Sequence, residues 1–202
     1  MQELPMRPTF LSLALLSAVT AVAAVAPGTS HRFGYSTFRE DAGRLVVFVD
    51  GYPASVGGDE AYVPIPLAVA LVKSGGSLTF TPESFTLIDR KGNSLPAAGF
   101  REVTEGHGRM EFERSLMRMR PIVVATWVTE LPRIPSRFFP APSSGTRIPR
   151  VHLAPQSWFR DVVYFPRPPA GLSGTLTLRV DVAGAAPVEV RFAASPDELA
   201  KR

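Results

Sequence analysis

The sequence that decides the fold runs from Ala61 to Pro96 and reads AYVPIPLAVALVKSGGSLTFTPESFTLIDRKGNSLP. Every odd position from Val63 to Leu71 is apolar, and a two-residue period places those side chains on one face of a strand. The alternation resumes after Gly76, with serine and threonine between the apolar residues. This pattern predicts antiparallel strands with one buried and one solvated face each.

Two prolines mark one end of the long strand. Pro64 and Pro66 fall on its even positions, and proline has no N–H to donate to a ladder. We therefore expect this end of the strand to lie at a sheet edge or at a bulge.

The same reasoning outward from this stretch predicts an all-β protein. Strands are predicted over residues 44–50, 61–71, 77–81, 84–88, 122–128, 158–165, 175–182 and 188–192. About eight strands without a βαβ rhythm predict a two-sheet β-sandwich of immunoglobulin-like topology, with a barrel as the alternative.

One short helix interrupts the strands. Residues 109–120 contain neither proline nor glycine, and Pro121 ends the run. Phe112, Leu116 and Met119 have the spacing of one helical face, so we expect this helix to cover one end of the sandwich. Arg114 points away from that face.

The composition is that of a globular domain. The chain has 202 residues, 45% of them hydrophobic and 20% charged, with 20 prolines and 16 glycines. A net charge of +4 is mild. The chain has no cysteine, which excludes disulfides, thiolate metal sites, a cysteine nucleophile and attachment of a lipid to cysteine.

The N-terminal residues predict export to the periplasm or the extracellular space. Residues 9–26 are almost wholly apolar or small and follow Arg7, as in a signal peptide covering residues 1–26. We expect cleavage near Ala23 or Ala24, with an uncleaved membrane anchor as the alternative. The remaining divisions are a polar lead-in (27–43), the sandwich domain (44–193) with a proline-rich loop (131–149), and a polar tail (194–202).

No catalytic or cofactor signature is present in the sequence. The phosphate-loop, zinc-protease and serine-hydrolase motifs are absent. His107 is the one histidine with acids close by in sequence, at positions 105, 111 and 113, but zinc sites generally need several spaced ligands. We therefore expect no metal, no cofactor and no catalytic residue.

The candidate binding region is the basic segment from Arg109 to Arg150. It holds eight arginines and three acids, so its net charge of +5 exceeds the net charge of +4 of the whole chain. Arginines interleaved with aromatic groups serve polyanion binding or protein interfaces. The candidate residues are Arg109, Arg114, Arg118, Arg120, Arg137, Phe138 and Phe139. The alternative is a solvated helix face beside a loop whose phenylalanines pack into the core.

Two stretches carry a resemblance to a known family. Phe85–Asn93, which reads FTLIDRKGN, and Leu172–Leu178, which reads LSGTLTL, resemble the turn and the late strand of bacterial exported immunoglobulin-like (telokin-like) domains. The resemblance implies a binding or envelope-associated module of uncharacterised function, and it carries no catalytic residue over to this chain.

Three functions are compatible with these observations. The first is an exported, non-enzymatic interaction module whose partner is another envelope protein or an anionic polymer. The second is a hydrolase of envelope polymers with paired acids on the sandwich loops. The third is a polyanion-binding module. We find no strong nucleic-acid signal, and we expect membrane contact only through the leader, if it is not cleaved.

Overall fold

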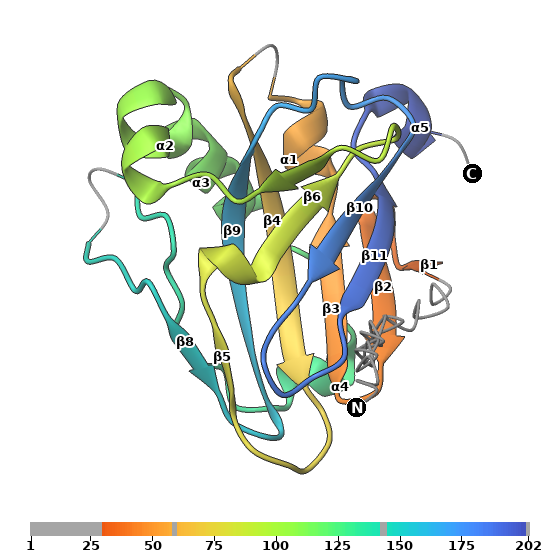
Figure 1. The fold of residues 1–202 in the computed structure, drawn as a ribbon, viewed down its shortest axis with the longest axis vertical. Helices are drawn as coiled ribbons and strands as arrows, with labels where there is room; N and C mark the ends of the chain where they lie inside the picture. Colours follow the sequence, from red (N-terminus) through yellow and green to blue (C-terminus); the bar gives the residue numbers. More distant parts are fainter. Residues whose placement is uncertain (1–29, 58–59, 142–144, 201–202) are drawn as a thin grey trace, which may run out of the picture.

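The computed structural model describes residues 30–57, 60–141 and 145–200, so the predicted signal peptide and its cleavage site lie outside the described residues. The described chain is mostly β-strand, arranged in antiparallel sheets with few helices (Figure 1). This confirms the predicted β class.

The larger sheet has five strands in the order β1-β2-β3-β4-β9. Their bounds are β1 (His31–Arg32), β2 (Thr37–Ala42), β3 (Leu45–Asp50), β4 (Tyr62–Leu71) and β9 (Ser157–Pro166). β4 pairs with β9 along its whole length, from Tyr62 opposite Pro166 to Leu71 opposite Ser157. β9 is the last strand of this sheet.

A second sheet of four strands has the order β11-β10-β6-β7. These strands are β6 (Phe85–Ile88), β7 (Ser94–Pro96), β10 (Thr175–Val180) and β11 (Val188–Ala193). A further pair joins β5 (Leu78–Phe80) to β8 (Val151–Leu153). Asp89 closes the turn between β6 and β7 by accepting hydrogen bonds from the backbone of Lys91 and Asn93.

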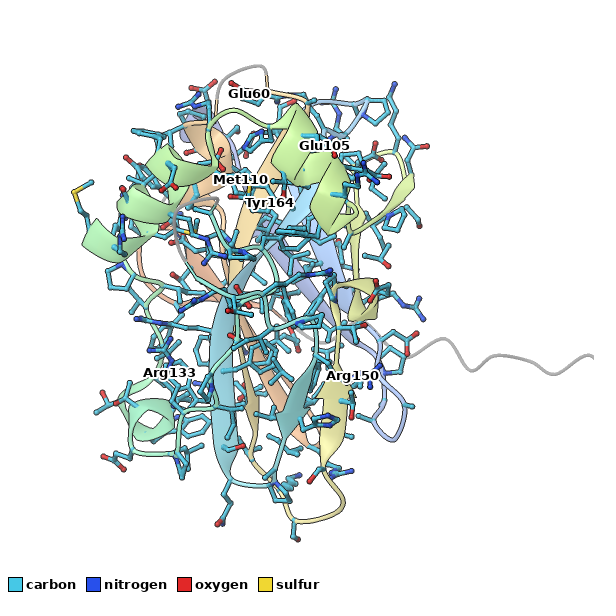
Figure 2. The ribbon with its side chains drawn as sticks, turned by 90° about the vertical axis from the view of Figure 1, so that its left-hand side faces the viewer. Glu60, Glu105, Met110, Arg133, Arg150 and Tyr164 are labelled. Carbon is cyan, nitrogen blue, oxygen red and sulfur yellow. The ribbon has the colours of Figure 1, made fainter. Side chains whose placement is uncertain are left out.

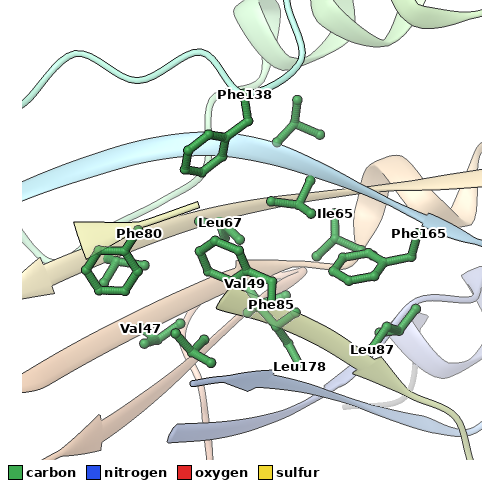
Figure 3. Packing of buried hydrophobic residues seen from close by; sticks show 14 of the residues in the cluster. Val47, Val49, Ile65, Leu67, Phe80, Phe85, Leu87, Phe138, Phe165 and Leu178 are labelled. Atoms are coloured by element: carbon green, nitrogen blue, oxygen red, sulfur yellow. The ribbon is translucent and has the colours of Figure 1, made fainter. Parts of the chain in front are cut away.

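The main core lies between the inner face of the five-stranded sheet and the smaller sheets (Figure 3). Its members include Val47, Val49, Ile65, Leu67, Phe80, Phe85, Leu87, Phe138, Phe165 and Leu178, all of them fully buried. Full burial of a side chain of this size stabilises the fold by about 1.5–3 kcal/mol. The odd positions of β4 supply the centre of this core, as their alternation predicted.

The outer face of the same sheet is also covered. Val46, Phe48, Ala68 and Ala70 pack against residues 122–131, which include the single-turn helix α4 (Thr126–Thr129). The predicted strand over 122–128 is therefore wrong. Its apolar composition reflects burial against the sheet and not pairing within it.

The two prolines of β4 lie where the strand has lost one neighbour. The Val72 N–H donates to the Arg44 carbonyl at 2.9 Å, so the even positions of β4 direct their N–H groups toward β3. Pairing with β3 stops at Leu67 opposite Val49, one residue before Pro66 would have to donate. β4 is thus a central strand. Its proline end is paired with β9 but has no partner on the side of β3.

The chain forms more elements than the sequence predicted, because several are too short to show a period. β1 and β2 fall within the predicted lead-in, β7 and β8 have three residues each, and the polar tail contains α5 (Pro196–Ala200). The predicted helix is α3 (Met110–Met119), and the unpredicted helices α1 (Tyr52–Ser55) and α2 (Phe100–Gly106) lie before it. A single 3-10 turn, η1, spans Pro82–Ser84.

Gly51 provides a test of how tightly the two large sheets meet. A Cβ at this position would lie 1.8 Å from the Ala193 carbonyl oxygen, whereas one at Gly76 would meet nothing within 4 Å. We expect Gly51→Ala to lower the free energy of unfolding by about 3 kcal/mol through overpacking. Gly76→Ala should change it by less than about 0.5 kcal/mol. Urea denaturation of both variants measures this, and equal midpoints would contradict the described packing.

Candidate functional site

A pocket opens on the outer side of the five-stranded sheet, beside the edge of β9. Its volume is about 440 Å³, and its walls are α3, the turn at residues 121–122, the chain at 133–137 and β9 itself. Seven charged side chains line it: Arg114, Arg118, Arg133, Arg137, Arg160, Glu111 and Asp161. The positive charges come from three separate parts of the chain.

The proline-rich loop forms one wall because it covers the free edge of β9. Trp158 N donates to the Pro132 carbonyl at 3.1 Å, and Ile134 N donates to the Trp158 carbonyl at 2.7 Å. The Ser136 hydroxyl then donates to the Arg160 carbonyl at 2.6 Å. A covered edge cannot pair with another chain, and the same contacts hold this wall of the pocket beside Arg160.

Asp161 fastens the loop at the base of the pocket. Its carboxyl oxygens accept hydrogen bonds from the backbone N–H groups of Phe138 and Val162, both at 2.8 Å. The Arg114 guanidinium lies 3.7 Å away and donates to the Phe139 carbonyl. Only 1% of the Asp161 side chain is exposed, and this burial raises the pKa of its carboxyl, against the opposing effect of Arg114.

The pocket carries excess positive charge. Five guanidinium groups face two carboxyl groups, which leaves three positive charges when both acids are ionised. Partial burial, and then the nearby Arg133, lower the pKa of Arg160. Because like charges repel, a bound anion would stabilise this arrangement.

A buried polar network lies on the inner side of α3. His107 Nε2 is 2.9 Å from both carboxyl oxygens of Glu113, and the Tyr164 hydroxyl donates to Glu113 at 2.9 Å. Glu60 lies 3.8 Å from His107 Nδ1. Figure 2 shows Met110 and Tyr164 beneath the helices, while Arg133 lies farther down, near α4. The side chains of His107, Glu113 and Tyr164 are buried, so we assign the network a structural role.

Burial dominates the protonation of this network. It raises the pKa of the Glu113 carboxyl, although hydrogen bonds from His107 and Tyr164 work in the opposite direction. Burial and the adjacent Glu113 raise the pKa of Tyr164 well above its ordinary value of 10.0. A phenol held in this way stays protonated and remains a hydrogen-bond donor.

This network also reverses the predicted orientation of α3. Phe112, Leu116 and Met119 have the spacing of a core face, yet Phe112 is 51% exposed and Met119 is 78% exposed. Met110 and Glu113 are the buried residues of the helix. Because the bonds to His107 and Tyr164 require Glu113 to face inward, Arg114 turns toward the pocket and Phe112 turns toward solvent.

The candidate residues predicted from sequence separate into three groups. Arg114, Arg118 and Arg137 line the pocket. The other two arginines lie elsewhere: Arg109 donates to the Gly57 carbonyl at 2.9 Å, and the Arg120 guanidinium lies 3.7 Å from the centre of the Tyr52 ring.

The aromatic candidates, Phe138 and Phe139, form the third group. Both are fully buried in the main core, so neither presents its ring to solvent beside the arginines. The alternative, in which the phenylalanines of the loop pack into the core, is confirmed.

Sequence reasoning missed two arginines of the pocket. Arg133 was counted in the basic segment but was not selected as a site residue. Arg160 lies in β9, opposite Ala68. The available signal was the pair of charged residues, Arg160 and Asp161, within the otherwise apolar run WFRDVVYF.

Comparison with known proteins gave no match to any protein-family model, curated protein or solved structure. The resemblance to exported immunoglobulin-like domains therefore stays a prediction. Among the described residues, no helix has the length and apolar character needed to cross a bilayer. The same residues contain no group of three or more histidine and acidic side chains suited to a metal ion.

The buried carboxyl of Glu113 predicts an unusual pH dependence. An acid whose pKa is raised by folding stabilises the protein below its unfolded-state value, near 4.5, and this stability is lost as the pH rises through the folded-state value. Glu113→Gln removes this titration. We expect the stability of the variant, relative to that of the unmodified protein, to increase as the pH rises from 4.5 toward neutrality.

Urea denaturation at several pH values measures this difference. Glu105→Gln is the matched control, because Glu105 belongs to the exposed pair with Arg101 and its removal should give a nearly flat difference. A relative stability of Glu113→Gln that falls with rising pH would show that Glu113 has a lowered pKa instead.

Proposed function

We propose that this chain is an exported, non-enzymatic binding module that holds an anionic group of its partner in the arginine pocket. The observation that carries the proposal is the convergence of five arginines around one pocket that also contains only two acids. Export rests on the predicted signal peptide at residues 1–26. The immunoglobulin-like topology belongs to the same proposal and rests on the alternating strands and the resemblance described above.

The chemistry of the pocket favours phosphate, sulfate or carboxylate groups. A guanidinium presents its N–H groups in a planar fork that can bind two oxygens of such a group at once. Arg114 Nε is buried and has no hydrogen-bond partner among the described residues. Arginines from α3, the loop and β9 surround the pocket, so they could contact one anion from several sides.

The two other functions have less support. A hydrolase with paired acids needs two acids that reach the substrate. Glu113 is buried in its network and both oxygens of Asp161 are bonded to backbone N–H groups, so Glu111 is the only exposed acid among the described residues that line the pocket. A polymer of many charges requires an extended basic track, whereas five arginines gather around one pocket and Arg109 and Arg120 of the same basic segment lie outside it. We therefore favour recognition of a single anionic group.

Binding of inorganic pyrophosphate, measured by calorimetry, tests the pocket. We expect Arg133→Ala and Arg118→Ala each to weaken binding by about tenfold, since a hydrogen bond to a charged group contributes about 1.5–3 kcal/mol. The loss should shrink at high salt, because the pocket is open to solvent and ions screen it.

The matched control is Arg101→Ala. Arg101 has an 88% exposed side chain paired with Glu105 on α2 and does not line the pocket. Pyrophosphate binding that is the same in Arg101→Ala, Arg118→Ala and Arg133→Ala would overturn the proposed site, as would a failure of the unmodified protein to bind.

A further inference from the structure

The chain presents large apolar side chains to solvent in one segment. Among the described residues, five such side chains are exposed, and four of them lie between residues 112 and 127: Phe112, Met119, Val123 and Trp127. The fifth, Tyr35, has its ring 5.5 Å from the guanidinium of Arg120, which follows α3 directly. Trp127 belongs to α4, which lies at the opposite end of the molecule from α3 (Figure 1), and the Arg39 guanidinium lies 5.7 Å from the centre of its ring. The exposed large apolar residues of α3 itself are Phe112 and Met119.

The exposed apolar residues of α3 are those that would ordinarily be buried. An amphipathic helix on a soluble domain turns its apolar stripe inward. Here the inner positions are held by Met110 and by Glu113 with its hydrogen bonds, so Phe112 and Met119 are left outside. The Arg109 guanidinium lies 4.9 Å from the centre of the Phe112 ring, and Phe112 and Met119 remain 51% and 78% exposed.

The same helix also contributes the cationic wall of the pocket. Arg114 and Arg118 line the pocket from α3. At about 100° of rotation per residue, position 118 lies about 100° from position 119 and about 120° from position 112, whereas position 114 lies about 140° and about 160° from them. One short helix therefore carries exposed apolar side chains about a third of a turn from the exposed Arg118, while Arg114 lies toward the opposite side.

We infer that α3 docks this protein on an anionic phospholipid surface. Phe112 and Met119 enter the boundary between head groups and acyl chains, and the pocket arginines hold a lipid phosphate. This inference rests on the proposed function and names its partner. An interfacial helix combines arginines on one face with phenylalanine and other apolar residues on the other, and it needs little net hydrophobicity.

Charge complementarity selects this partner over a soluble anion or a protein. A phospholipid leaflet places phosphate groups directly above an apolar layer, and α3 places a phosphate-binding pocket beside apolar side chains. Basic residues near an anionic leaflet each contribute to attraction. A soluble anion would use the pocket alone and leave Phe112 and Met119 without a role.

Vesicle binding by the full chain tests the inference. Sedimentation with phosphatidylcholine vesicles, with and without phosphatidylglycerol, should show tighter binding when the anionic lipid is present. We expect Phe112→Ser to weaken binding to the anionic vesicles by about tenfold through lost apolar burial. Its affinity for pyrophosphate should not change. Arg133→Ala should weaken binding both to anionic vesicles and to pyrophosphate.

The absence of cysteine permits a direct measurement of insertion. A fluorophore that is sensitive to polarity is attached at Met119→Cys or, as a control, at Ser77→Cys in the exposed loop between β4 and β5. Figure 1 shows that this loop lies at the opposite end of the molecule from α3. Anionic vesicles should shift the emission to the blue at position 119 and leave it unchanged at position 77.

The outcomes separate this inference from the proposed function. Pyrophosphate binding without any effect of Phe112→Ser on vesicle binding would overturn the docking surface and leave the arginine pocket intact. Equal binding to vesicles with and without phosphatidylglycerol would also overturn it, because docking through the pocket arginines requires an anionic lipid. If the unmodified protein binds neither pyrophosphate nor anionic vesicles, both proposals are overturned.

Discussion

The structure depends on the burial of β4 on both of its faces. Its odd positions form the centre of the main core, and its even positions meet residues 122–131 on the other side. The backbone N–H and C=O groups of a strand in this position have to form hydrogen bonds with neighbouring strands. Pairing with β9 over its full length does this on one side, and β3 does so on the other as far as Pro66.

This arrangement makes β9 an edge strand and thereby creates the location of the pocket. An exposed edge invites pairing with other chains, and the proline-rich loop prevents that by bonding to Trp158, Arg160 and Asp161. Prolines suit this task because they have no N–H group to donate. A proline-rich segment therefore makes only a few backbone hydrogen bonds with the edge strand and does not form a regular ladder. The arginine pocket is thus a consequence of how the sheet edge is protected.

Much of the fold could be predicted from the sequence, because the longer strands show a clear local pattern of apolar residues. β4, β10 and β11 alternate clearly, and β9 is an apolar run of strand length. Residues 122–128 were misread because a segment that covers a sheet and a strand within a sheet have similar apolar composition. The order of strands in each sheet depends on contacts between distant residues, which no local pattern records.

The site was only partly readable, for a different reason. The orientation of α3 is decided by Glu113, whose bonds to His107 and Tyr164 connect residues that are 6 and 51 positions away. Hydrophobic periodicity assigns the inner face to Phe112 and Met119 and gives no weight to such bonds. Once Glu113 faces inward, Arg114 joins Arg160 at the pocket, although 46 positions separate the two in the sequence.

The acid at the base of this pocket differs from the acids of two exposed ion pairs. Arg39 lies 2.6 Å from Asp41, and Arg101 lies 2.8 Å from Glu105, so these charges are matched locally. Asp161 instead lies 3.7 Å from Arg114 and directs its oxygens to backbone donors. Because the Asp161 carboxyl group bonds to backbone donors of the loop, it offsets the charge of Arg114 only weakly at this distance. The pocket lining has more arginines than acids, and the proposed anionic group would offset this excess of positive charge.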